Sequence, residues 1–433
     1  MTNPTIPAPE LLQNPVNDMN AKIFDGSVQL ERIREHARHL RLGPTSLLMA
    51  TLAALSCNIA PNVMLDIGKG PGSLNLFVAL VGVPGSDKSR TIKYAKKILR
   101  VSNPSVEYEV RGLGSGEGIS AAYADTVRYE DKQRITKPGL KSVLWEQSEV
   151  SELKTLASRQ GSTLQSQLTK LYTAEFLNFT NKDGGHVVQD DSYRASFILG
   201  VQPGRADILL KDSDQGFPQR FVWAETTDPS RMRGTDYPPV DPVSVRIPNY
   251  PGGIIQGCES AVHQLQVESD AVLIDGKDRG LDGHTLLTRA KVAALLAVLR
   301  EHPQMTEDDW TRAGYIIMAS NRARQACIDF KEKRHQEIQQ WKERRNEDEE
   351  RRKIAVIRNR IFEILRKDRY KDGWVNGGTI SQQMSGNHNR GELFEIALGR
   401  LVDEGHLLVQ PNPKSKKNMQ YRLAPTQERR KSA

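Results

Sequence analysis

Three apolar runs of strand length occur along the chain, at residues 76–81 (LFVALV), 142–145 (SVLW) and 195–201 (ASFILGV). None alternates polar with apolar positions, so each is typical of a parallel strand buried on both faces of a sheet. Between them, residues 92–99 and 150–179 carry apolar side chains at helical spacing. Strands that alternate with helices in this way predict an α/β fold around a parallel sheet.

Further helical patterns precede the first strand. Residues 28–42 and 44–60 are expected to form two helices, the second of them largely apolar. Residues 1–25 are rich in Pro and Asn and lack periodicity, so we expect them to be disordered. Residues 129–141 form a polar segment for which no helix or strand is predicted.

The last third of the chain is predicted to be mainly helical. Residues 286–299 show a clean amphipathic pattern, and Thr306 with Asp309 predicts a cap that resembles a capping box at the next helix. Charged helical sequence then runs over residues 311–367. Its middle, residues 331–352, is nearly all polar, which indicates a solvated helix or a linker.

The segment after the first strand has the layout of a phosphate-binding loop. Gly82 and Gly85 allow a tight turn lined by backbone amides, and Lys88 and Ser89 stand at the start of the following helix. In this interpretation Lys88 reaches the β- and γ-phosphates of ATP and the Ser89 hydroxyl ligates Mg²⁺. The loop residues assigned to ATP are Gly82, Pro84, Gly85, Ser86, Asp87, Lys88, Ser89 and Arg90.

Asp87 departs from the usual pattern G-x-x-x-x-G-K-[ST], which has Gly at this position. Asp tolerates left-handed backbone better than most residues, so the shape of the loop is expected to survive. Its carboxylate is compatible with a triphosphate only if it points to solvent or toward the metal. The alternative interpretation is an ordinary strand–turn–helix with a surface Lys88.

A nucleotide-hydrolysing site also needs an acid at the end of a second strand, to hold Mg²⁺ and polarise the attacking water. Glu146, Glu149 and Glu152 follow the strand at residues 142–145. We favour Glu149 as the catalytic carboxylate, with Glu146 as its alternate or as a metal partner. The alternative is that these acids only form the first turn of a helix, where they favour the dipole.

Two further polar residues are candidates for the same site. Gln202 follows the strand at residues 195–201, and is either a residue that senses the γ-phosphate or a turn residue before Pro203. Arg220 lies among aromatic neighbours in GFPQRFVW (216–223). One interpretation is an arginine finger that contacts the nucleotide of a neighbouring subunit. The alternative is an arginine that packs on aromatic rings or pairs with an acidic side chain.

Composition limits the classes of protein that fit. The 433 residues are enough for two or three domains, and three widely spaced cysteines form no disulfide framework or metal knuckle. The most apolar run, residues 46–60, is too short to span a bilayer, and the N-terminus carries no signal-peptide pattern. We therefore expect a cytoplasmic protein with no membrane partner.

Charge is concentrated at the C-terminus. Residues 351–433 hold 18 Lys and Arg against 8 Asp and Glu, a net charge of +10, whereas the whole chain carries +8. The remaining residues therefore sum to about −2. This imbalance is typical of a nucleic-acid-binding appendage on a near-neutral domain.

The C-terminal pattern predicts a winged helix, a helix-turn-helix variant. Helices are expected at residues 354–365, 379–384 and 389–405, followed by two short strands at 407–409 and 419–423 around a basic turn. A winged helix used for protein contacts is the alternative to one that binds DNA. The candidate DNA-binding residues are Arg390 and Arg400 on the third helix and Lys414, Lys416 and Lys417 in the wing.

Taken as an ordered set, these segments resemble the phage and mobile-element P-loop ATPases described as helicase-like or primase-associated, which are related to AAA+ engines such as minichromosome-maintenance helicases. The resemblance rests on GVPGSDKS (82–89), SEVSEL (148–153), VQP (201–203), GFPQRFVW (216–223) and LTRAKVAALLAVL (287–299) followed by MTEDDWTRAG (305–314). It covers roughly residues 40–330. The chain departs from the family at Asp87 and in lacking an Asp-Glu pair.

The resemblance implies a P-loop NTPase core of AAA+ type with a helical lid, in which Arg289 would sense the γ-phosphate. It also implies ATP and Mg²⁺ as cofactors, assembly into a hexameric ring, and movement on DNA. The expected domains are a tail (1–25), a helical segment (26–73), the ATPase core (74–257), the lid (258–330), a charged linker (331–352), the winged helix (353–424) and a basic tail (425–433).

Two functions remain open from the sequence. The first is an ATP-dependent DNA motor, a replicative helicase or an initiator of a phage, plasmid or other mobile element. The second is a non-catalytic DNA-binding initiator or repressor, in which the degenerate loop is a scaffold or an ATP-gated assembly switch. No catalytic cluster of a primase is recognisable, so priming would require a separate primase.

Overall fold

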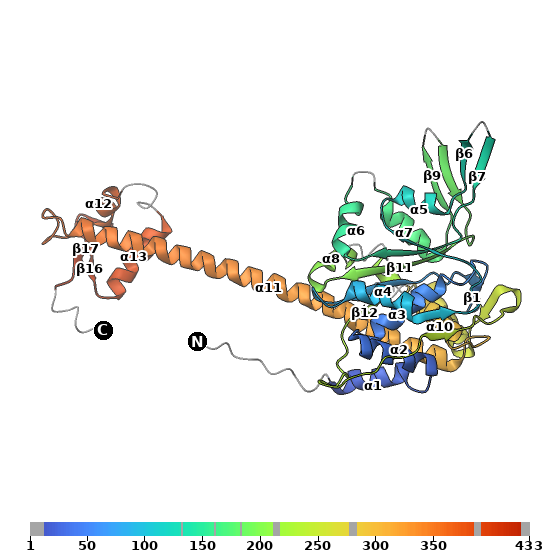
Figure 1. Cartoon of the computed structure of the whole chain (residues 1–433). Coiled ribbons are helices and arrows are strands. Elements are labelled where there is room, and N and C mark those ends of the chain that lie inside the picture. The colour runs from blue at the N-terminus through green and yellow to red at the C-terminus, as the bar shows by residue number, and fades with distance from the viewer. Residues whose placement is uncertain are drawn as a thin grey trace. The chain divides into compact units, whose positions relative to one another are not determined.

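The computed structural model describes residues 13–130, 133–159, 162–181, 184–210, 217–276, 284–384 and 391–425 (Figure 1). The chain divides into two compact units, Met1–Lys331 and Glu332–Ala433. Helix α11 (Glu307–Leu365) begins in the first unit and ends in the second. No helix of the described residues is long and apolar enough to cross a membrane.

The first unit is built around a parallel sheet of five strands in the order β12-β3-β11-β8-β5. The strands are β12 (Phe221–Glu225), β3 (Phe77–Val81), β11 (Arg194–Val201), β8 (Ser142–Gln147) and β5 (Glu109–Gly112). The three predicted strands are confirmed as β3, β8 and β11, and every residue of β3 and β11 is buried. The prediction of an α/β fold with a parallel sheet is therefore confirmed.

Helices cover both faces of this sheet because its strands are apolar on both sides (Figure 1). On one face, Val78 and Leu80 pack in a core shared with α3 (Pro44–Ser56), α4 (Lys88–Ile98) and α10 (Thr285–Leu299). On the other face, Phe77 and Ala79 share a core with α5 (Gly116–Tyr123) and α7 (Leu164–Thr173). The alternation along β3 sends successive side chains to opposite cores.

The remaining elements of the first unit are short or lie at its periphery. They are α2 (Val28–Leu40), β1 (Met64–Asp66), β2 (Pro71–Gly72), β4 (Leu99–Val101), α6 (Val150–Ala157), η2 (Pro203–Arg205), α8 (Asp207–Leu210), η4 (Pro218–Arg220), β13 (Val243–Val245), η5 (Pro251–Gly253), β14 (Ile254–Gln256) and α9 (Glu259–Leu273). The stretch 150–179, which was predicted to be helical, contains two separate helices, α6 and α7.

Two hairpins are absent from the sequence prediction. Strands β6 (Thr126–Glu130) and β7 (Gln133–Lys137) form the first, which overlaps the polar segment at residues 129–141 for which no element was predicted. Strands β9 (Leu177–Asn181) and β10 (Gly184–Val188) form the second, where the predicted helix was extended too far. Each strand has only five residues and few apolar side chains, so even the alternation of Leu177 and Phe179 with polar residues in β9 is too short to identify a half-buried strand.

The N-terminal segment also differs from its prediction. Residues 1–12 lie outside the described part, but α1 (Gln13–Phe24) is a helix within the stretch that was expected to be disordered. Ile23 and Phe24 are almost fully buried in the core of the first unit. Tertiary packing of these two side chains stabilises a helix whose own sequence is a weak helix former.

The helices of residues 258–330 pack into the first unit. Helix α10 confirms the helix predicted at residues 286–299, but it is not amphipathic, because all its residues from Ala290 to Leu299 are buried in the core that contains α3. The predicted cap before α11 is confirmed, since the Thr306 amide donates to Asp309 Oδ2 at 3.0 Å and the Asp309 amide donates to Thr306 Oγ1 at 3.2 Å.

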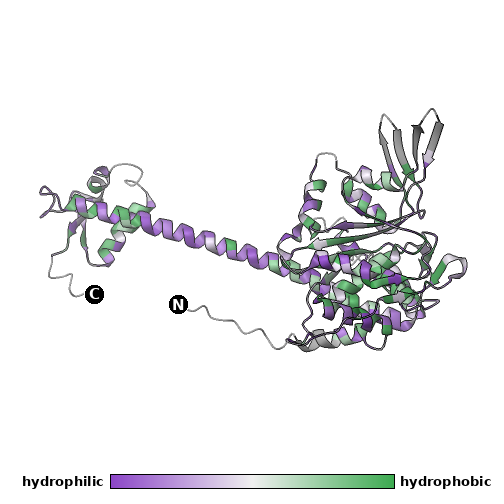
Figure 2. Cartoon of the chain, viewed as in Figure 1, coloured by the Kyte–Doolittle hydropathy of each residue, from purple (hydrophilic) through white to green (hydrophobic). Residues whose placement is uncertain are grey.

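The second unit contains the C-terminal part of α11, then β15 (Val375–Asn376), α12 (Gly377–Gln382), α13 (Glu392–Asp403), β16 (Leu407–Asn412) and β17 (Ser415–Leu423). The three strands form an antiparallel sheet in the order β15-β17-β16. Its core includes Ile361, Phe394 and Leu401. Residues 332–352 of α11 are exposed throughout, as predicted for a solvated helix, and Figure 2 shows them as a mainly hydrophilic stretch.

Candidate functional site

The turn between β3 and α4 holds the predicted phosphate-binding residues. Gly85 has φ of 79°, and Asp87 has φ of 57° and ψ of 27°, so both adopt left-handed backbone. Gly reaches this region at no steric cost and Asp at a small one. Asp87 therefore occupies the conformation for which the usual pattern has Gly, and the helix starts directly after it at Lys88.

The carboxylate of Asp87 is engaged by its own helix. Asp87 Oδ2 lies 3.1 Å from Arg90 Nη1, and both side chains are partly exposed. Arg90 Nη2 also donates to the carbonyl of Leu40 at 3.1 Å. The negative charge next to the loop is thus partly compensated and directed toward solvent, as the sequence interpretation required.

Gly82 leaves no room for a side chain. A Cβ there would lie 2.1 Å from Ser86 Oγ and 2.1 Å from Thr226 Oγ1. The Gly82 amide donates to the Val201 carbonyl at 3.0 Å, and the Thr226 amide donates to the Val81 carbonyl at 2.9 Å. The start of the loop is therefore fixed between the ends of β11 and β12.

Lys88 folds back over the loop. Its Nζ donates to the carbonyls of Gly82 and Val83, at 2.9 Å each, and to Ser86 Oγ at 3.3 Å. Burial lowers the pKa of Lys88, while the charge of Glu149 acts in the opposite direction. An ammonium held by loop carbonyls is positioned to exchange them for an anion. Ser89 is exposed beside it.

The acid at the end of β8 faces helix α4. Glu146 forms an ion pair with Lys96, and both side chains are about one-quarter exposed. The next residue, Gln147, donates from its side chain to Glu152 on α6. Because Lys96 neutralises Glu146, this carboxylate does not present an unpaired negative charge to the loop.

Glu149 lies at the same edge of the sheet and is half exposed. Its Oε2 is 3.7 Å from Arg205 Nη1 and accepts a hydrogen bond of 3.3 Å from Ser151 Oγ. Arg205 also donates to Ser151 Oγ at 2.8 Å. Sequence reasoning missed Arg205, although a basic residue three positions after Gln202 was a signal that could have identified it.

β11 lies directly between the loop strand and the acidic strand. A Cβ on Gly200 would lie 2.0 Å from the Ser148 carbonyl oxygen and 3.6 Å from Lys88 Cδ. The ends of β8 and β11 and the Lys88 side chain therefore converge. Gln202 is half-buried and starts η2 at this edge, so the structure brings it near the loop that begins at Gly82.

Arg220 lies at the amino ends of the strands, whereas the loop follows the carboxyl end of β3. It directly precedes β12, whose first residue Phe221 pairs with Phe77, so it lies roughly 16 Å along the strands from the loop. It is buried, with its guanidinium 6.0 Å from the centre of the Tyr172 ring, and burial lowers its pKa. Within a single chain it does not join the site.

Arg289 is engaged within the helices. Its Nε and Nη2 donate to the Trp310 carbonyl at 3.2 and 2.9 Å, and its Nη1 donates to Gln264 Oε1 at 3.0 Å. The guanidinium also lies 3.8 Å from the centre of the Trp310 ring. These contacts connect α9, α10 and α11.

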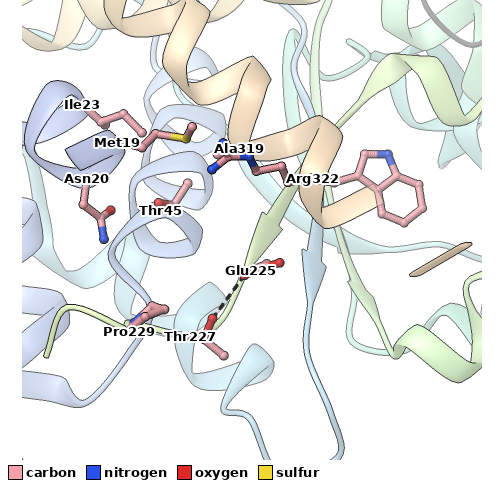
Figure 3. Close-up of a pocket in the computed structure, with 10 residues that line it drawn as sticks. Met19, Asn20, Ile23, Thr45, Glu225, Thr227, Pro229, Ala319 and Arg322 are labelled. Carbon is pink, nitrogen blue, oxygen red and sulfur yellow. Dashed lines mark hydrogen bonds between the residues drawn. The ribbon is translucent and has the colours of Figure 1, made fainter. Parts of the chain in front are cut away.

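A cavity of about 100 Å³ lies at the end of β12, with Glu225 and Thr227 in its lining (Figure 3), and none of the loop residues 82–90 lines it. Thr226, which contacts Gly82, lies between these two residues. The rest of the lining is formed by Met19, Asn20 and Ile23 of α1, Thr45 of α3, Trp223, Pro229, and Ala319 and Arg322 of α11. Such a mixture of apolar walls and a few polar groups suits a small organic ligand.

The predicted DNA-binding residues fall in the second unit. Arg400 is exposed on α13. Lys414 is exposed between β16 and β17, where its amide donates to Asn412 Oδ1 at 2.9 Å. Arg390 and the side chains of Lys416 and Lys417 lie outside the described part.

In the described part of the chain, no three His, Cys, Asp or Glu side chains converge as a metal cluster. A scan against protein-family models found no family that matches the chain, and a search of curated proteins found no match.

Proposed function

We propose that this protein is an ATP-dependent DNA motor with a P-loop NTPase core of AAA+ type and a C-terminal winged helix. The observation that carries the proposal is the topology around the loop. After β3 the chain crosses the sheet in one direction, to β5 at the far edge. After β11 it crosses in the other direction, over β3 to β12. Because β3 and β11 are neighbours, the direction of winding reverses between them. Ligands of open α/β sheets bind at the carboxyl ends of strands at such a switch point.

ATP and Mg²⁺ would supply the phosphoanhydride bond and the Lewis acid that polarises it. The amides of the loop at Gly82–Ser89 and the N-terminus of α4 would bind the phosphates. Lys88 would exchange the Gly82 and Val83 carbonyls for phosphate oxygens, and the exposed Ser89 hydroxyl would hold the metal. The donor types at this edge of the sheet fit both groups.

Glu149 is the preferred catalytic carboxylate. It is half exposed at the edge that carries Lys88, and it is close enough to affect the Lys88 pKa. Its role would be to accept the proton of the attacking water, while Gln202 orients that water. Glu146 would serve as a metal partner only after release from Lys96.

The cavity lined by Glu225 and Thr227 is our candidate for the base of the nucleotide, because Thr226 between them lies next to Gly82 at the start of the loop. Filling it by Ala319→Leu should weaken binding of ATP but leave binding of inorganic triphosphate unchanged, since triphosphate contacts only the loop. Equal weakening of both ligands would contradict this assignment. Titration by calorimetry measures the two affinities.

Ring assembly is part of the proposal because Arg220 lies far from the loop of its own chain. In a hexameric ring, Arg220 of one subunit would reach the nucleotide of its neighbour after leaving the Tyr172 ring, and Arg289 would respond to the same phosphate after release from Trp310 and Gln264. The winged helix would engage DNA, and a separate primase would provide primers. Sizing by light scattering with and without ATP tests the ring.

The deciding experiment is ATP turnover with and without DNA. We expect DNA to stimulate turnover, and Lys88→Ala to abolish it by removing the cation that binds the phosphates. Lys93→Ala serves as the matched control because it removes an exposed cation of the same helix outside the loop. Absence of turnover under every DNA condition would contradict the motor.

A second candidate is an initiator or repressor that uses ATP only as an assembly switch. Two observations favour it, the acidic Asp87 in the loop and the neutralised Glu146. It predicts ATP-dependent sizing without turnover. Lys88→Ala would then abolish assembly.

A further inference from the structure

The exposed surface of α13 is acidic. Glu392, Glu395 and Asp403 are all exposed, and Arg400 is the single basic residue of this helix. A helix that lies against DNA brings its exposed side chains close to phosphates, which repel carboxylates. The charge of α13 therefore opposes the role of DNA-contacting helix that the sequence interpretation gave it.

Besides the lysines around Lys414, a second group of basic residues of the second unit lies at the end of α11 and in the turn that follows. We call residues 366–374 the basic turn. Its four basic residues are all exposed, against the two acids Asp368 and Asp372. The basic residues are Arg366, Lys367, Arg369 and Lys371.

The basic turn is held in place by hydrogen bonds. The Tyr370 amide donates to the Lys367 carbonyl at 2.8 Å, and the Gly373 amide donates to the Tyr370 carbonyl at 3.3 Å. Arg369 Nη2 donates to Gln383 Oε1 at 2.6 Å, which connects the turn to the end of α12. A fixed backbone presents its cations at defined spacing, so less conformational entropy is lost on binding.

Aromatic rings lie under the cations. The Arg369 guanidinium is 4.7 Å from the centre of the Tyr370 ring. At the end of the turn, Arg422 of β17 lies 5.0 Å from the centre of the Trp374 ring. Arginines stacked on rings keep their N–H groups directed outward, and this combination is common where proteins bind nucleic acid.

We propose that the basic turn, and not α13, is the surface through which the second unit binds the phosphate backbone of DNA. This inference rests on the proposed DNA-binding function and adds the position of the contact. Lys367 and Lys371 would contact phosphates as point charges. Arg366 and Arg369 would bind them through their forked N–H groups.

The test uses the full chain and a short fluorescein-labelled DNA, as a duplex and as its single strand, with affinity followed by anisotropy over a salt series. Lys367→Gln/Lys371→Gln should weaken binding about tenfold or more, and should lower the slope of log affinity against log salt by about 2. The matched control, Arg400→Gln, should leave both unchanged. All three substitutions are at exposed positions.

Each outcome has one meaning. Loss of affinity confined to Arg400→Gln, or equal affinity in all three proteins, overturns the basic turn as the contact while DNA binding itself stands. If the unaltered protein binds no DNA, both this inference and the DNA part of the proposed function fail. ATP turnover measured without DNA in the same preparations shows separately whether the ATPase part survives.

Discussion

Lys96 on α4 forms an ion pair with Glu146 at the end of β8. The pair connects the helix that follows the loop with the strand that carries the candidate acids. Because Lys96 is two turns along α4 from Ser89, on the same face, it draws Glu146 away from the start of the helix. Under the proposed function, this contact keeps one carboxylate out of the catalytic site.

Lys96→Met is therefore expected to raise ATP turnover severalfold by releasing Glu146 for the metal. Steady-state turnover at saturating ATP measures the effect. Lys93→Met, one turn earlier and exposed, is the matched control and should not change turnover. A fall in turnover with Lys96→Met would instead mean that the ion pair positions β8 for catalysis.

Asp87→Gly is expected to tighten ATP binding, since it removes a negative charge beside the phosphates. The unfolding free energy should change by less than about 1 kcal/mol, because relief of left-handed strain offsets loss of the exposed pair with Arg90. Asp87→Ala keeps the strain and should lower the unfolding free energy by about 1 kcal/mol. Calorimetric titration and urea unfolding measure the two quantities, and equal ATP affinity in all variants would contradict the charge argument.

Gly200→Ala should disturb the junction of β8 and β11. The new methyl group would lie 2.0 Å from the Ser148 carbonyl oxygen, so a backbone shift is required, at a cost of about 1–3 kcal/mol in urea unfolding. Gly114→Ala is the control, because a Cβ there meets nothing within 4 Å. Unchanged stability and ATP binding in Gly200→Ala would show that this close approach is not maintained.

His284 makes the stability of the first unit sensitive to acid. Burial, together with the charges of Arg220 and Lys291, lowers the pKa of His284 to about 4 from 6.5. The unfolded chain binds a proton first as the pH falls from 6.5 toward 4, so stability is lost across this window, by about 3 kcal/mol at most.

His284→Asn should flatten the dependence of the unfolding free energy on pH between 4 and 6.5. The exposed His263→Asn should leave that dependence unchanged. Urea unfolding at a series of pH values measures it. Parallel curves for His284→Asn and the unaltered protein would contradict the role of this imidazole.

Much of the first unit follows from local sequence. The strands β3 and β11 are uninterrupted apolar runs, and the Thr306–Asp309 cap is a short-range pattern. The two hairpins were not predicted because their strands are short and carry few apolar side chains. Helix α1 was not predicted because its stability depends on contacts distant in sequence. Helix α1 depends on the burial of Ile23 and Phe24.

By itself the sequence determined the order of buried strands and helices, the glycine turn before Lys88 and the surplus of positive charge at the C-terminus, since each of these depends on neighbouring residues. Only the tertiary structure decided how charges pair. It joined Glu146 to Lys96, positioned Arg205 beside Glu149, and turned the acidic side of α13 outward. Ion pairs and exposed faces depend on distances in space, and residues far apart along the chain set those distances.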